Sequence, residues 1–76
     1  MLRDLIEYIA LSLVDDQEAV RVDERRRGDR TILVLSVAEE DFGRVIGKEG
    51  RIAMAMRGLL HVAGAHSGRE AVLEVR

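Results

Sequence analysis

The residues best suited to chemistry form one short stretch, Val45-Ile46-Gly47-Lys48-Glu49-Gly50-Arg51-Ile52, in which two glycines three apart separate two helical patterns. Glycine adopts backbone angles that other residues resist, and its lack of a side chain lets a sugar-phosphate backbone approach closely. A helix that begins after the turn would direct its N-terminal amides toward a phosphate, and Lys48 and Arg51 would add positive charge. The stretch predicts a phosphate-contacting turn, and the alternative is a plain glycine-rich connection between helices.

Other chemistries have little support in the sequence. His61 and His66 are five residues apart, so they do not share a helical face, and there is no cysteine; we therefore expect no metal site and no cofactor. The glycine stretch lacks the Gly-x-x-x-x-Gly-Lys-Ser/Thr pattern of a nucleotide-hydrolysing loop. No Ser-His-Asp set is apparent, and we predict that the protein is not an enzyme.

Composition favours one small globular domain, residues 1–76, with 47% hydrophobic and 34% charged residues. No run approaches the roughly 20 apolar residues of a membrane-spanning helix, and the N-terminus does not resemble a secretory signal. The absence of cysteine fits a reducing compartment. We expect a cytoplasmic protein with no membrane association.

Positive charge gathers at two places although the net charge is −2. One is the glycine stretch. The other is an arginine cluster, Arg25, Arg26, Arg27 and Arg30. This cluster is either a second nucleic-acid contact or a solvated hairpin tip, and the second interpretation is the more common one for such charge patterns.

The flanking segments predict the elements that position the glycine stretch. Apolar residues at helical spacing indicate a helix over residues 2–14, and alternation of Val20 and Val22 with charged residues indicates a strand. Residues 25–29 are expected to turn, and the apolar run 31–37 to form a central strand covered on much of both faces.

The second half of the chain supplies the remaining predicted elements. We expect helices over residues 38–46 and 51–65, with the glycines between them, and a last strand over 71–76. The predicted order is therefore α-β-β-α-α-β.

The βααβ unit with a Gly-x-x-Gly turn at its middle resembles a KH domain, a family that clamps about four nucleotides of single-stranded RNA or DNA with such a loop. The full order resembles the bacterial type II arrangement. Residues 41–60, from Asp41-Phe42-Gly43-Arg44 to Met56-Arg57-Gly58-Leu59-Leu60, are similar to the small stand-alone bacterial KH proteins of the KhpA type. This resemblance implies an α+β fold, a three-stranded sheet with three helices on one face.

The resemblance also implies a function: binding of single-stranded RNA as a chaperone or post-transcriptional regulator. The motif does not separate RNA from single-stranded DNA, because contacts to the 2′-hydroxyl are not part of it. The implied contact residues are Arg44, Val45, Ile46, Gly47, Lys48, Glu49, Gly50, Arg51 and Ala53. Three of them, Val45, Ile46 and Ala53, would form the apolar floor of the groove together with the second strand.

A competing hypothesis is a protein-protein interaction module in which RNA contact is weak or secondary. Ile52, Met54 and Val62 lie off the main apolar stripe of the predicted helix 51–65. They either cover neighbouring loops or form a surface for a homodimer, and the resemblance makes a KhpB-type KH protein a candidate heteromeric partner. Met54 stands where relatives commonly carry lysine, and Glu49 opposes phosphate, so we expect modest RNA affinity.

Overall fold

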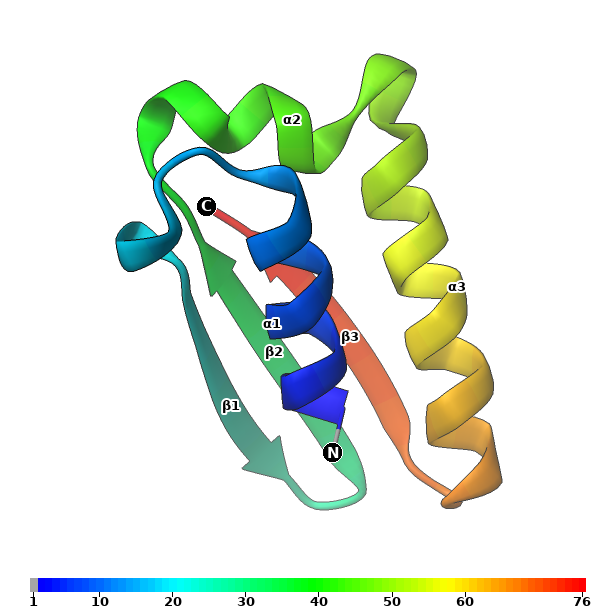
Figure 1. The fold of residues 1–76 in the computed structure, drawn as a ribbon. Coiled ribbons are helices and arrows are strands. Elements are labelled where there is room, and N and C mark those ends of the chain that lie inside the picture. The colour runs from blue at the N-terminus through cyan, green and yellow to red at the C-terminus, as the bar shows by residue number, and fades with distance from the viewer. Residues whose placement is uncertain (1) are drawn as a thin grey trace.

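The computed structural model describes residues 2–76, which form one layer of strands and one layer of helices (Figure 1). The strands are β1 (Arg21–Arg27), β2 (Arg30–Ser36) and β3 (Glu70–Val75). They follow the spatial order β1-β2-β3, with β1 antiparallel and β3 parallel to β2. The parallel pair needs a crossover, which the helices between β2 and β3 supply.

The helices lie on one face of this sheet, as predicted (Figure 1). They are α1 (Leu2–Leu13), α2 (Phe42–Ile46) and α3 (Arg51–His66). Short 3-10 turns precede β1, α2 and α3 at Gln17–Ala19, Glu39–Asp41 and Lys48–Gly50. The α+β fold and the order α-β-β-α-α-β are therefore confirmed. Within residues 2–76, no helix has the length and apolar character needed to cross a bilayer.

The core lies between the helices and the sheet. Leu33 and Leu35 of β2 are completely buried, and they meet Ile6 of α1 and Leu60 of α3, which are also completely buried. Alternate residues of a strand point to opposite faces, so β2 presents these leucines to the helices. The central strand thereby holds both long helices to the sheet by burial of apolar side chains.

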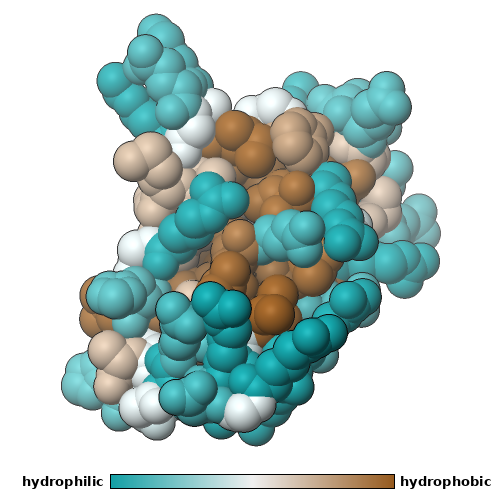
Figure 2. Space-filling view, turned by 180° about the vertical axis from the view of Figure 1, so that it is seen from behind, coloured by the Kyte–Doolittle hydropathy of each residue, from teal (hydrophilic) through white to brown (hydrophobic). Residues whose placement is uncertain are grey.

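The opposite face of the sheet, the back face, carries no helix. Figure 2 shows apolar side chains in its middle, surrounded by hydrophilic ones. The register places Val34 between Asp23 and Glu74, and Val34 is only 3% exposed. The apolar run of β2 is covered on both faces, as predicted, by the helices on one side and neighbouring side chains on the other.

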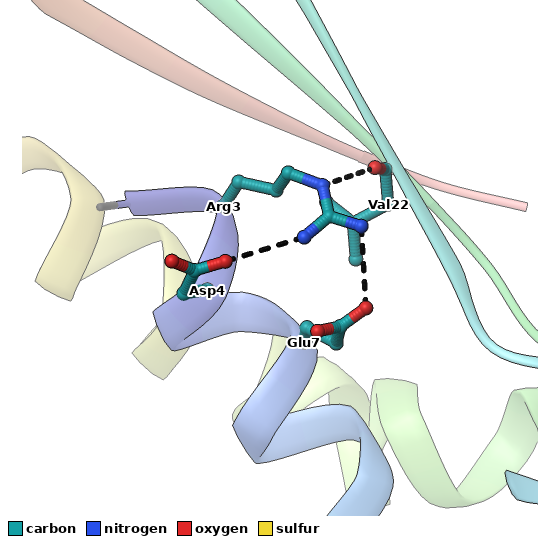
Figure 3. A network of polar contacts seen from close by, with 4 residues as sticks. All are labelled: Arg3, Asp4, Glu7 and Val22. Atoms are coloured by element: carbon teal, nitrogen blue, oxygen red, sulfur yellow. Dashed lines mark hydrogen bonds and ion pairs between the residues drawn. The ribbon is translucent and has the colours of Figure 1, made fainter.

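Arg3 fastens α1 to the outer edge of β1 (Figure 3). Its Nε donates to the carbonyl of Val22 at 2.9 Å. Its two terminal nitrogens pair with Asp4 and Glu7, each at 3.2 Å. The guanidinium is therefore held at three points, and it joins two elements that are 19 positions apart in the chain.

Two predicted boundaries were wrong. Arg25, Arg26 and Arg27 belong to β1 and not to a turn, because the antiparallel register continues to Arg27 opposite Arg30. The bend is confined to Gly28 and its neighbour, and Gly28 takes a left-handed φ of 61°. The helix predicted over 38–46 divides into the turn Glu39–Asp41 and the five-residue α2.

Candidate nucleic-acid interface

The glycine turn, Gly47–Gly50, connects α2 to α3. Gly47 has a φ of 79° and Gly50 a φ of 77°, and Glu49 between them also has a positive φ, 57°. These are left-handed backbone angles, which cost little for glycine but are strained for most other residues. Two of the three positions with a positive φ are thus glycines, and the chain passes from α2 into α3 within four residues.

The two glycines differ in what surrounds them. A Cβ on Gly47 would lie 2.6 Å from Cγ1 of Ile52 and 2.9 Å from its backbone nitrogen. A Cβ on Gly50 would meet nothing within 4 Å. Gly47 is therefore required by close packing, whereas the space beside Gly50 is open to solvent or a ligand.

The N-terminus of α3 opens directly onto this space. Its N-cap residue is Gly50, which has no side chain to accept hydrogen bonds from the first-turn amides. A helix of 16 residues carries a partial positive charge at this end. Unsatisfied amides and a positive dipole end favour an anionic group such as a phosphate.

Charged side chains surround the turn, and most are already paired. Arg51 lies 3.2 Å from Glu49, and Arg44 lies 2.8 Å from Asp15. Lys48 is exposed and has no ion pair among the described residues. Exposed ion pairs exchange readily with solvent, so both arginines remain available to a phosphate, and Lys48 is available without breaking a pair.

Asp41 anchors the base of α2, although its side chain is only 1% exposed. Its two carboxylate oxygens accept hydrogen bonds from the backbone amides of Asp15 at 3.1 Å and Asp16 at 3.0 Å. These two hydrogen bonds hold the pKa of Asp41 below its ordinary value, and the bond from Asp16 has the larger effect. The nearby positive charge of Arg44 also lowers this pKa. The carboxylate thus ties the segment after α1 to the start of α2.

Sequence reasoning missed this anchor. Glu39, Glu40 and Asp41 open the predicted helix 38–46, where negative charge is common, so the sequence does not single out Asp41. A carboxylate followed at once by the inner face of a short helix was the available signal. Its partners lie 25 and 26 positions away in the chain, so only the tertiary structure identifies them.

The predicted apolar floor requires correction. Val45 is completely buried and Ala53 is 2% exposed, so neither side chain offers an accessible surface. Both pack beneath the turn because α2 and α3 meet there, and they support it from inside. Ile46 is half-buried. The second strand is also unsuitable as a floor, because its helix-facing side chains, Thr31, Leu33 and Leu35, are buried.

The structure does not bring the arginine cluster to the turn. The β1–β2 hairpin and the glycine turn lie at opposite ends of the molecule (Figure 1). Arg26 pairs with Glu24 at 3.0 Å, and Arg30 pairs with Glu70 at 2.8 Å. The cluster is a separate, exposed basic area.

The three residues of the predicted partner surface divide into two kinds. Ile52 is half-buried and packs against the core. Met54 and Val62 are 65% and 62% exposed, so they form an apolar outer surface of α3. Within residues 2–76, no group of three or more His, Cys, Asp or Glu side chains could hold a metal ion.

Comparison with known proteins extends these observations. A family model described as "KhpA/KhpB, KH domain" matches residues 3–75. The chain is 43% identical to the "RNA-binding protein KhpA" of Clostridium perfringens, covering 97% of this chain and 99% of that one. It is 39% identical to the protein of the same name from Bacillus subtilis, over 97% of this chain and 91% of the other.

Among solved structures, the chain resembles part of the crystal structure of a variant of Era from Aquifex aeolicus bound to GDP and tetrafluoroaluminate, with a TM-score of 0.62 and 15% identity. The match covers 97% of this chain and 29% of the Era chain, and at this identity it concerns the fold alone. The family model and the relatives together cover nearly the whole sequence, including the glycine turn. The chain therefore belongs to the KhpA/KhpB family of KH-domain proteins.

Proposed function

We propose that this protein binds single-stranded RNA through the glycine turn. The observation that carries the proposal is the open, uncapped N-terminus of α3 behind Gly50, with the exposed Lys48, which has no ion pair within residues 2–76, beside it. Relatives that share about two fifths of the sequence are named RNA-binding proteins. Residues 1–76 act here as one KH domain.

In this proposal each residue of the turn has a distinct role. Gly50 leaves room for the sugar-phosphate backbone, and the first-turn amides of α3 donate to a phosphate. Lys48 supplies a free positive charge, and Arg44 and Arg51 exchange their carboxylate partners for phosphate. Gly47, Val45, Ile46 and Ala53 hold the turn in shape. Glu49 opposes phosphate, which keeps the affinity modest.

The test compares the wild type with a Lys48→Asp/Glu49→Asp variant in a fluorescence-anisotropy titration of a mixed single-stranded RNA pool. Aspartate at position 49 tolerates the left-handed angle better than most residues. We expect salt-sensitive binding by the wild type and at least a tenfold loss in the variant, because repulsion replaces attraction at the phosphate.

Arg21→Asp is the matched control, since it makes the same charge change at an exposed position of β1. Circular dichroism checks that each variant is folded. Equal RNA affinity of the wild type and the turn variant would refute the proposal. An equal loss in the Arg21 variant would show a general charge effect and not a site at the turn. Single-stranded DNA of the same sequence measures the preference for RNA.

A second function, partner docking through α3, is favoured by the exposure of Met54 and Val62. Exposed apolar side chains on a small domain are a common feature of protein interfaces. The occupant would be a second copy of this chain or a KhpB-type KH protein. Met54→Glu should reduce the mass measured by light scattering to that of a monomer, whereas a monomeric wild type would argue against the homodimer.

We infer that the protein acts in the cytoplasm as an RNA chaperone or post-transcriptional regulator, and that it carries no cofactor and catalyses no reaction. Contact of the arginine cluster with RNA is a secondary element of the proposal, because these arginines lie at the far end of the sheet. Arg25→Ala with Arg27→Ala should then weaken binding of long RNAs more than of short ones.

A further inference from the structure

The outer edge of β3 is an open row of backbone groups. The amide of Arg76 donates to Leu35 at 2.8 Å, and the amide of Glu70 donates to Asp29 at 3.1 Å. Even-numbered residues of β3 therefore direct their backbone groups toward β2. Because these directions alternate along a parallel strand, Ala71, Leu73 and Val75 direct theirs outward, to the edge beside α3.

Each open edge of the sheet carries one arginine that donates to an outward carbonyl. On the β1 edge, Nε of Arg3 donates to Val22 at 2.9 Å. On the β3 edge, Nε of Arg57 donates to Leu73 at 3.4 Å. The two contacts are of the same kind: in each, an arginine on a helix donates a hydrogen bond to a backbone carbonyl of the adjacent edge strand.

The two arginines differ in how firmly they are held. Arg3 also pairs with Asp4 and Glu7 (Figure 3). Arg57 is exposed, its bond is near the upper limit of hydrogen-bond length, and no carboxylate pairs with it in the described part of the chain. Arg3 is a structural tie, whereas Arg57 is free to exchange its partner.

Arg57 also lies in line with the glycine turn. It follows Gly50 by seven residues, so it lies about two helical turns further along α3 on the same face, about 10 Å from Gly50 along the helix axis. A single-stranded RNA that is bound at the turn and extends along α3 therefore brings its next bases to Arg57 and to the open edge of β3.

We propose, on the basis of the RNA-binding function above, that Arg57 is the residue that selects a base, and that it selects guanine or cytosine over adenine and uracil. The guanidinium leaves the carbonyl of Leu73 and donates two parallel N–H groups to two adjacent acceptors, O6 and N7 of guanine or O2 and N3 of cytosine, a pair that adenine and uracil lack. The released carbonyl of Leu73 then accepts a hydrogen bond from the ligand or from water, so no buried acceptor is left unpaired.

The test uses a uridine-rich RNA of about seven nucleotides with guanine, adenine, cytosine or uracil at its centre. Binding of the wild type is compared with Arg57→Lys, which keeps the charge and removes the planar fork. We expect the wild type to bind the guanine and cytosine RNAs about tenfold more tightly than the uracil RNA, and the variant less than about twofold more tightly, with affinity for the uracil RNA nearly unchanged. Arg21→Lys, at an exposed site on the back face, is the control.

The outcomes separate this inference from the function on which it rests. A wild type that binds all four RNAs equally, or an Arg57→Lys variant that keeps the preference of the wild type, overturns the role of Arg57. In both cases the loss caused by Lys48→Asp/Glu49→Asp would still support RNA binding at the turn. An equal loss for all four RNAs in Arg57→Lys shows a phosphate contact and also overturns base selection. No binding by the folded wild type overturns both proposals.

Discussion

Gly47 and Ile52 lie in direct contact across the glycine turn, with the backbone of one against the side chain of the other. A Cβ on Gly47 would stand 2.6 Å from Cγ1 of Ile52, closer than non-bonded atoms approach. Ile52 in turn packs against the core, so it has little freedom to move away. The contact couples the shape of the turn to the packing of α3.

This contact predicts different costs for two similar substitutions. Gly50→Ala should lower the free energy of unfolding by about 1–2 kcal/mol, the cost of a left-handed alanine. Gly47→Ala should lower it by about 2–5 kcal/mol, because overpacking against Ile52 adds to a backbone conformation, φ 79° and ψ 172°, that is almost restricted to glycine. Urea denaturation of both variants measures the difference. Equal losses would mean that Ile52 moves aside and that the contact is not rigid.

The ion pair between Arg44 and Asp15 predicts a gain of affinity. Asp15→Asn should strengthen RNA binding about two- to threefold, because Arg44 no longer divides its charge between a carboxylate and a phosphate. Asp16→Asn is the matched control: it makes the same charge change at an exposed neighbour for which no ion pair is found in residues 2–76. Equal gains in the two variants would attribute the effect to net charge and not to the pair.

The buried carboxylate of Asp41 predicts a pH dependence of stability. Its pKa is lowered in the folded protein, so folding favours the ionised form, and the resulting stability is present above the ordinary aspartate pKa of about 3.9. This contribution is lost as the pH falls through the lowered pKa.

Asp41→Asn should therefore be clearly less stable than the wild type near neutral pH, and the difference should shrink below about pH 4. Urea denaturation midpoints measured from about pH 7 to about pH 3 test this expectation. A difference that stays constant over this range would show that the loss comes from packing and that ionisation of Asp41 contributes nothing to it.

The arginines on the two sheet edges predict unequal effects on stability. Arg3→Ala should lower the free energy of unfolding by about 1–2 kcal/mol, since it removes the bond to Val22 and two partly exposed ion pairs. Arg57→Ala should lower it by less than about 0.5 kcal/mol, because its single hydrogen bond, to the carbonyl of Leu73, is long at 3.4 Å. A large loss of unfolding free energy in the Arg57 variant would show that Arg57 stabilises the packing of α3 against β3, as Arg3 stabilises that of α1 against β1.

Much of the fold followed from local patterns in the sequence. The apolar run of β2 and the helical stripe containing Met56 and Leu60 are strong signals, because their periods match the geometry of strand and helix. Boundaries were less certain. Arg25–Arg27 have no apolar pattern, and they form a strand only because β2 pairs with them across the sheet.

The sequence by itself determined the order of elements and the glycine turn, because glycine spacing, charge and apolar period are local properties. Tertiary structure decided which residues of the turn are accessible. Val45 and Ala53 lie next to exposed residues in the chain, yet they are buried where α2 and α3 meet. The partners of Asp41 and Arg57 lie 16 or more positions away in the chain. Contacts of this kind depend on how helices and strands pack, and no local pattern contains them.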